Sequence, residues 1–199
     1  IKEVFHRVTH ISSTGYNTTS FLSRKDYNVF MVDWSKLSRF PCYLSSLSNL
    51  KLAAQCTAQL YSYITKAGAL SKMTTCVGHS LGAHLCGMMS QHLTEKQYKI
   101  IGLDPARPLV TQFGSSIYRL SREDAHIVQV LHTNAGFLGE AGQVGHADFC
   151  INGGRLQPGC TGHFMSNWIW VLMLLGGEWA FICGCFCSIM PKKLNHFDT

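Results

Sequence analysis

Short apolar runs rich in β-branched and aromatic residues alternate along this chain with segments whose apolar residues recur every three or four positions. Such runs are typical of buried strands, and they occur at residues 28–34, 73–77, 99–103 and 127–132. This spacing predicts a helix that packs on one face at residues 48–66, and a second helix is predicted at residues 81–93. Strands that alternate with helices indicate βαβ units and a largely parallel sheet with helices on both faces.

The composition is that of a packed globular protein. Hydrophobic residues make up 46% and charged residues 14% of 199 residues, so we predict a single domain spanning residues 1–199. The formal net charge of +6 favours anionic partners, including acidic lipid surfaces. Nucleic acid is not an expected partner, because the chain has no tight Lys/Arg cluster with interleaved aromatic residues.

Nine cysteines are a high count for this length. Because the number is odd, at least one thiol is free or bridges outward. High cysteine usage favours an oxidising, secreted or extracellular setting with disulfide bonds, and the glycosylation triplet Asn17-Thr18-Thr19 adds weak support. The chain has neither a starting Met nor a visible signal peptide, so we interpret it as a mature form or a fragment.

One segment, Trp168 to Met190, has about the length of a membrane span. Glu178 lies near its middle, where a charge costs roughly 2.5–3.5 kcal/mol on insertion scales. A buried helix plus strand is therefore the preferred interpretation, and a membrane-anchored protein is the alternative.

The second predicted strand is followed by Gly78-His79-Ser80-Leu81-Gly82, which is the pattern G-x-S-x-G. The pattern suits a sharp turn from strand to helix, which exposes the serine hydroxyl above the sheet. The same turn puts the backbone N–H of Leu81 at a helix N-terminus, where it can donate to a developing oxyanion. We therefore predict that Ser80 is a catalytic nucleophile; the alternative is a turn serine that caps a helix.

A serine nucleophile needs a histidine base and an acid that orients the base. Asp104 follows the third predicted strand, which ends at the same sheet edge as the strand before Ser80. Its position after Ser80 fits the order Ser, Asp, His of the α/β-hydrolase fold. Its alternative role is to start an Asp-Pro turn with Pro105.

Five stretches together resemble the pancreatic-lipase-like family, and especially its insect lipase and phospholipase A1 members. The stretches are Met31 to Tyr43, Val77 to Gly87, Ile101 to Pro108, Val130 to Asn134, and Val144 to Cys160. The resemblance implies an α/β-hydrolase that cleaves lipid esters, with Ser80 and Asp104 as nucleophile and acid. The family domain is longer at both ends, and the tail 168–199 resembles it poorly.

The resemblance also suggests the base, because His163 follows Cys160 and precedes Ser166 much as in the family. His196 is an alternative, and a chain that has lost its base is another. The family's Gly-aromatic pair after the first strand is missing here; Ile11 could still offer the second oxyanion N–H. Loss of one such donor typically lowers the rate about 100- to 1,000-fold.

No metal or other cofactor is expected. In the region that holds calcium in pancreatic-type members, Ser116 and Ser121 replace carboxylates and only Asp124 remains, whereas calcium needs several oxygen ligands. The loop 135–145 is short, and the family's lid is almost absent, which in the family accompanies phospholipase A1 activity. Phospholipid at a lipid–water interface is therefore the first substrate prediction and neutral glyceride the second. A catalytically impaired lipid-binding protein of the same fold is the rival hypothesis.

Overall fold

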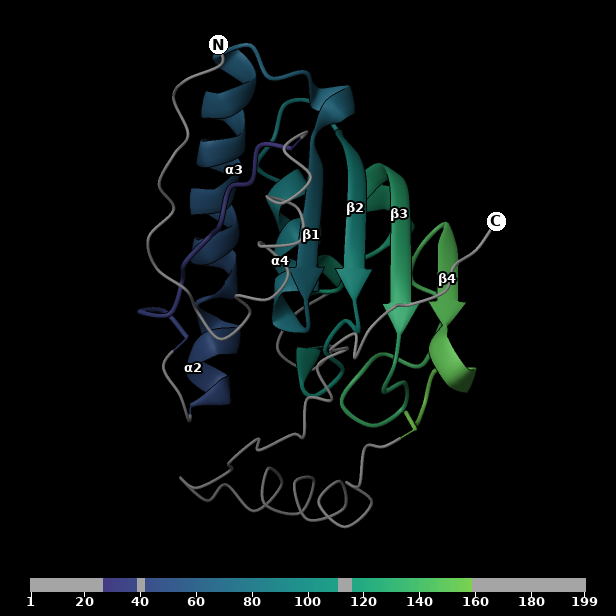
Figure 1. Ribbon diagram of the computed structural model, residues 1–199. Helices are drawn as coiled ribbons and strands as arrows, with labels where there is room; N and C mark the ends of the chain where they lie inside the picture. The colour runs from purple at the N-terminus through teal and green to yellow at the C-terminus, as the bar shows by residue number, and fades with distance from the viewer. Residues whose placement is uncertain (1–26, 39–41, 111–115, 159–199) are drawn as a thin grey trace, which may run out of the picture.

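Four parallel strands form one sheet, with neighbours in the order β1-β2-β3-β4. The computed structural model describes residues 27–38, 42–110 and 116–158 (Figure 1). The strands are β1 (Thr75–His79), β2 (Gln97–Leu103), β3 (Ala125–His132) and β4 (Ala147–Cys150). Their carboxyl ends point to one edge of the sheet (Figure 1). The predicted parallel sheet is confirmed, and β1, β2 and β3 begin within two residues of the predicted strands.

One predicted strand is absent, and one observed strand was not predicted. The run at residues 28–34 has no strand in the structure, and most of its side chains are exposed. An apolar pattern reports a tendency to be buried, but a strand also needs a neighbour for its backbone hydrogen bonds. Here the chain turns after Asp33, whose carboxylate accepts the N–H of Ser35, and Trp34 packs against a core formed by helices. The four-residue strand β4 was not predicted, because it is too short to show an alternation of apolar and polar residues.

Three α-helices lie in the described residues: α2 (Tyr43–Ser48), α3 (Leu50–Lys66) and α4 (Leu81–Ser90). The helix predicted over 48–66 is confirmed as α3, and the short helix α2, which was not predicted, precedes it and meets it at Asn49. The Asn49 amide donates to the carbonyl of Leu37 at 2.8 Å and so fixes the junction to the preceding loop. Short 3₁₀ turns complete the fold: η1 (Ser71–Met73), η2 (Ser116–Tyr118), η3 (Arg122–Asp124) and η4 (Ile151–Gly153).

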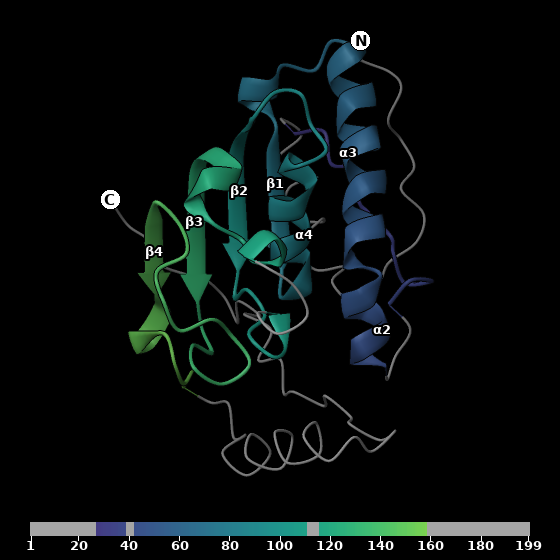
Figure 2. The ribbon, with the colours of Figure 1, turned by 180° about the vertical axis from the view of Figure 1, so that it is seen from behind.

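Helix α4 is the centre of the molecule. One side, which carries Leu81, Leu85 and Met88 at helical spacing, packs with α3. The other side, with Ala83 and Cys86, packs on β2 and β3. The view from behind shows α4 between α3 and the sheet (Figure 2). Helices over the opposite sheet face, which the sequence also predicts, are not among the described residues.

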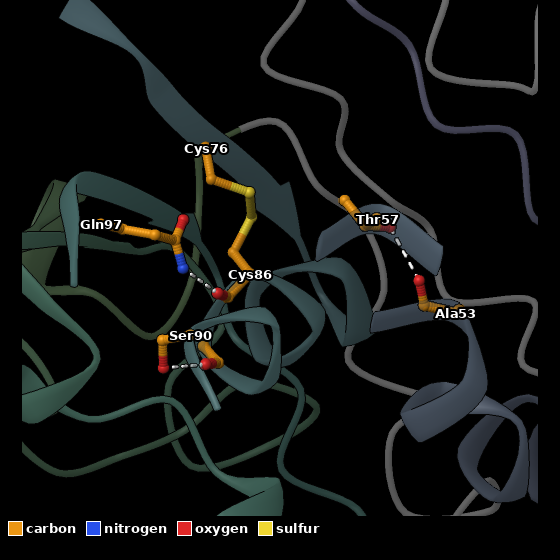
Figure 3. The surroundings of a disulfide bond; sticks show 7 residues. Ala53, Thr57, Cys76, Cys86, Ser90 and Gln97 are labelled. Atoms are coloured by element: carbon orange, nitrogen blue, oxygen red, sulfur yellow. Dashed lines mark hydrogen bonds between the residues drawn. A yellow bond between two sulfur atoms is a disulfide. The ribbon is translucent and has the colours of Figure 1, made fainter. Parts of the chain in front are cut away.

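A disulfide joins Cys76 of β1 to Cys86 of α4, across the layer between helix and sheet (Figure 3). The two cysteines are ten positions apart, and the segment between them contains the whole strand-to-helix turn. Close by, the Gln97 amide at the start of β2 donates to the Cys86 carbonyl at 2.8 Å. A disulfide of this kind typically stabilises a fold by about 2–4 kcal/mol, and here it ties the helix to the strand that precedes it.

The predicted tail 168–199 and the candidate span Trp168 to Met190 lie outside the described residues. Among the residues that the structure describes, no helix combines the length and hydropathy that crossing a membrane requires.

His84 of α4 is fully buried and connects three parts of the fold. Its Nδ1 accepts the N–H of Leu120 at 3.0 Å, so the ring proton sits on Nε2, which donates to the carbonyl of Ala106 at 2.6 Å. Burial is the main reason that its pKa falls to about 4; the backbone contact to Ala106 partly opposes that shift, and the charge of Arg119 adds to it. The neutral ring is therefore part of the folded state.

This pKa predicts a pH-dependent stability. The His84 pKa is below its ordinary value of 6.5 in the folded chain, so the unfolded chain binds more protons between pH 6.5 and 4. As the pH falls from 6.5 to 4, the free energy of unfolding should therefore decrease by on the order of 3 kcal/mol. Urea unfolding of wild type and His84→Gln at several pH values measures this decrease. The stability difference between the two should shrink as the pH falls; a constant difference contradicts the assignment.

Candidate functional site

Ser80 occupies the turn between β1 and α4 in a backbone conformation that is unusual for a residue with a side chain. Its φ is 55° and its ψ is −120°, a sparsely populated region that persists only where the surroundings enforce it. The side chain is half-buried and stands at the amino end of α4. The N–H of Leu81, the first residue of α4, has no acceptor within the helix. The turn thus combines a hydroxyl, a backbone donor and a helix N-terminus.

Gly78 allows this turn. A Cβ at Gly78 would collide with backbone atoms of Gly82 and Ala83 in the first turn of α4, whereas a Cβ at Gly82 would meet nothing within 4 Å. The two glycines of the motif therefore differ in what they do. The first is required for the close approach of strand and helix, and the second has open space beside it.

Asp104 lies at the corresponding place on the next strand. His79 and Leu103 are register partners in β1 and β2, so Ser80 and Asp104 are the next residues on the two strands. The Ser80 N–H donates to the carbonyl of Leu103 at 3.0 Å. Asp104 also has a positive φ, of 47°, which is uncommon for a non-glycine residue. Desolvation lowers the pKa of His79, although part of its side chain reaches solvent, and the Asp104 charge nearby partly opposes this.

The Asp104 carboxylate is held by the backbone that follows β3. The N–H groups of Thr133 and Asn134 both donate to Oδ1, at 3.1 and 3.0 Å. A Cβ at Gly139 would lie 2.5 Å from the same oxygen, so only glycine lets this loop close over the carboxylate. These donors were missed by the sequence analysis, since backbone groups leave no signal in side-chain identity.

A buried network joins the end of β3 to β4 and to the loop that follows β3. His132, the last residue of β3, contacts Asp148 through Nε2 at 2.8 Å and the carbonyl of Glu140 through Nδ1 at 3.1 Å. Burial alone would raise the pKa of Asp148, but hydrogen bonds from His132, Val144 and Gly145 lower it. Both ring nitrogens of His132 are engaged, as are those of His84. Neither ring is free to serve as a base.

Glu140, in the loop after β3, forms an ion pair at 3.2 Å with Arg119, which precedes β3. Burial raises the pKa of Glu140, and the charges of Arg119 and Arg107 oppose that shift. The loop that covers Asp104 is therefore tied down by side-chain charge as well as by backbone hydrogen bonds.

Two predicted site residues, Ile11 and His163, lie outside the described residues, as does the alternative base His196. The structure brings together the other three: Ser80, Leu81 and Asp104. Asp124, the carboxylate left in the calcium region, accepts the N–H of Ser121 at 2.8 Å and the hydroxyl of Ser90 at 3.4 Å. Within the described ranges, no group of three or more His, Cys, Asp or Glu residues could hold a metal ion.

Comparisons with known proteins show the family of the chain. The protein-family model described as Lipase matches residues 12–185. Lipase member H-B of Xenopus laevis is 35% identical over 149 residues, which cover 75% of this chain and 32% of the relative. Phospholipase A1 member A of Mus musculus is 33% identical over 154 residues, covering 77% and 33%. Phospholipase A1 of Vespula vulgaris is 32% identical over 180 residues, covering 80% and 53%. The chain thus spans between a third and about half the length of these curated relatives.

The different surroundings of the two motif glycines yield a prediction. Gly78→Ala should destabilise the fold by about 3 kcal/mol or more, because overpacking against rigid backbone cannot relax easily. Gly82→Ala should leave stability unchanged or raise it by up to about 1 kcal/mol, because alanine favours a helix over glycine. Chemical denaturation of the two variants tests this. Equal losses in both would show that the space beside Gly82 is not open.

Proposed function

The chain belongs to the lipase family, and on that basis we propose that it is a secreted serine hydrolase that cleaves carboxylic ester bonds of lipids. The observation that carries the proposal is the pairing of Ser80 and Asp104, each one residue beyond neighbouring parallel strands and each at positive φ. Strained, half-buried polar residues at the carboxyl edge of such a sheet favour a catalytic role. Because the chain spans only part of the length of its relatives, its activity is inferred from the family together with the site.

The proposed reaction is acyl transfer in two steps. Ser80 attacks the ester carbonyl while His163 accepts its proton, and the Leu81 N–H, with Ile11 as second donor, stabilises the oxyanion. The alcohol then leaves with the proton from His163, and water releases the fatty acid. Asp104 stays ionised and orients the imidazole. Because Thr133 and Asn134 both donate to Oδ1, Oδ2 is the oxygen that suits the imidazole N–H. No cofactor enters the reaction.

We infer phospholipid as the first substrate and triacylglycerol as the second, with the ester at the sn-1 position as the bond that is cleaved. Two of the relatives carry the name phospholipase A1. The short loop 135–145 supports the same choice, because loops over a site decide how bulky a polar group fits beside the ester. Such substrates meet the enzyme at a lipid–water interface, so contact with a membrane surface is part of the proposal.

Secretion is supported by the disulfide between Cys76 and Cys86, since disulfides persist in oxidising compartments. The single domain over residues 1–199, with a divergent tail from residue 168, stays a prediction.

Serine-directed labelling tests the nucleophile. A fluorophosphonate probe should label the wild type and Ser35→Ala, whose serine is exposed and is not part of the proposed triad, but not Ser80→Ala. Fatty-acid release from phosphatidylcholine should fall by about 10³- to 10⁶-fold in Ser80→Ala. A folded wild type that neither labels nor releases fatty acid would support the rival, a lipid-binding protein that has lost its chemistry.

Paired substitutions test the base and the acid. His163→Ala and Asp104→Asn should each lower kcat by about 10³- to 10⁴-fold, since removing the base or its orienting carboxylate removes proton transfer. His196→Ala is the matched control and should retain activity. Loss of activity in His196→Ala alone would instead identify His196 as the base. The pH dependence of kcat/KM should show a histidine ionisation in the wild type.

A further inference from the structure

The side-chain amide of Gln157 bridges the ends of two strands. β3 and β4 are parallel neighbours (Figures 1 and 2), and His132 and Cys150 are their last register partners. The next residues along the chain are Thr133 and Ile151. Nε2 of Gln157 donates to the carbonyls of both, at 2.9 Å each. The half-buried glutamine therefore ties the two strand ends together one step beyond their pairing.

The orientation of this amide is fixed from both sides. The carbonyls of Thr133 and Ile151 can only accept, so the nitrogen of the Gln157 amide must face them. Its Oε1 accepts the side-chain amide of Asn152 at 2.8 Å. Pro158 comes next in the chain, and a proline favours extended backbone in the residue before it. The Gln157 donor is therefore preset before it meets the loop that follows β3.

The Thr133 carbonyl and the Asn134 N–H belong to one peptide group. Such a group is planar, and its C=O and N–H point in opposite directions. The carbonyl of this group accepts from Gln157, whereas its N–H donates to Oδ1 of Asp104 at 3.0 Å. A donor that holds the carbonyl on one side thus fixes the direction of the N–H on the other side.

The same series of hydrogen bonds strengthens the contact to the acid. Successive hydrogen bonds polarise the group between them, by about 10–30% per bond. A carbonyl that accepts from Gln157 makes the N–H of its peptide group a better donor to a carboxylate. The second donor to Oδ1, the Thr133 N–H at 3.1 Å, lies on the preceding peptide group. The two groups share the Cα atom of Thr133, so a rotation of one displaces the other.

Other hydrogen bonds set the course of the loop. The Ala135 N–H donates to the carbonyl of Gly154 at 2.8 Å, and the Leu138 N–H donates to Oδ1 of Asn134 at 2.9 Å. These bonds act on neighbouring peptide groups or on a side chain, whereas the Gln157 bond acts on the peptide group that faces the carboxylate. Loss of the Gln157 amide should therefore leave the loop folded and change mainly the direction of one N–H.

We propose that Gln157 is a positioning residue for the acid of the triad. It holds the peptide group between Thr133 and Asn134 so that backbone donors occupy Oδ1 of the acid. Oδ2 of Asp104 is then left for the imidazole of His163. The inference rests on the proposed function and deepens it: Gln157 touches no reacting atom and acts through Asp104.

The kinetics of Gln157→Leu test this role. Leucine keeps an apolar stem and removes every hydrogen bond of the amide. With short-chain phosphatidylcholine, kcat should fall about 10- to 100-fold while KM stays within about twofold of wild type. Removing the orienting acid costs about 10⁴-fold in kcat, and an acid that is present but misoriented should cost part of that. Titration with a fluorophosphonate counts the folded sites, so kcat refers to these alone.

Gln91→Leu is the matched control. The Gln91 amide also donates to a backbone carbonyl, that of Ile117 at 2.9 Å, but it follows the end of α4 that lies opposite Ser80. This variant should keep the wild-type kcat. An unchanged kcat in Gln157→Leu, or a change in KM alone, would overturn the proposal.

Gln157→Glu adds a readout that a loss of packing would not give. An ionised glutamate repels the Thr133 carbonyl, whereas the protonated acid donates its O–H to it. An unperturbed glutamic acid titrates near pH ~4.3. The ratio of kcat in Gln157→Glu to kcat in wild type should therefore rise as the pH is lowered from about 7 to about 5. The same ratio for Gln157→Leu should stay constant. A constant ratio for both variants would count against the positioning role.

NMR keeps this inference separate from the proposed function. The chemical shift of the Asn134 amide proton reports its hydrogen bond to Asp104, whether or not the protein hydrolyses an ester. Asp104→Asn should move this resonance, and Gln157→Leu should move it in the same direction, because both weaken a bond to an ionised acceptor. Gln91→Leu should leave it in place. This result would uphold the link from Gln157 to Asp104 even if wild type released no fatty acid. An unmoved resonance in Gln157→Leu would reject the link, whatever the activity.

Discussion

The close backbone contact between β1 and α4 at Gly78 is the constraint on which the rest of the site depends. With no side chain at this position, the first turn of the helix packs directly on the strand, and the chain must reverse within one residue. That residue is Ser80, and its positive φ is the consequence. A gentler turn would relieve the strain, but it would also lower the hydroxyl toward the sheet and move the Leu81 N–H away from it. The strained backbone of Ser80 is therefore both the feature that exposes its hydroxyl and a feature that the fold must stabilise.

A strained turn persists only if its two ends cannot separate, and the fold holds them in several ways. The disulfide between Cys76 and Cys86 closes a covalent ring around the turn. His84, one turn into α4, binds the loop after β2 through Ala106 and the segment before β3 through Leu120. The same helix is buried on both sides by two apolar clusters. The ring of His84 links the serine's helix directly to the segment that carries Asp104, so helix and acid loop keep a fixed relation.

The sequence predicted the parts of this arrangement that depend on local pattern. The apolar runs of β1, β2 and β3, the period of α4 and the glycine spacing around Ser80 each reflect a requirement that side chains record. The strand predicted at residues 28–34 was wrong because pairing depends on a neighbour and not on the run itself. The donors from Thr133 and Asn134, and the approach of Gly139 to Asp104, involve backbone that is 29 to 35 residues away along the chain. Nothing in the identities of those residues distinguishes them from an ordinary loop.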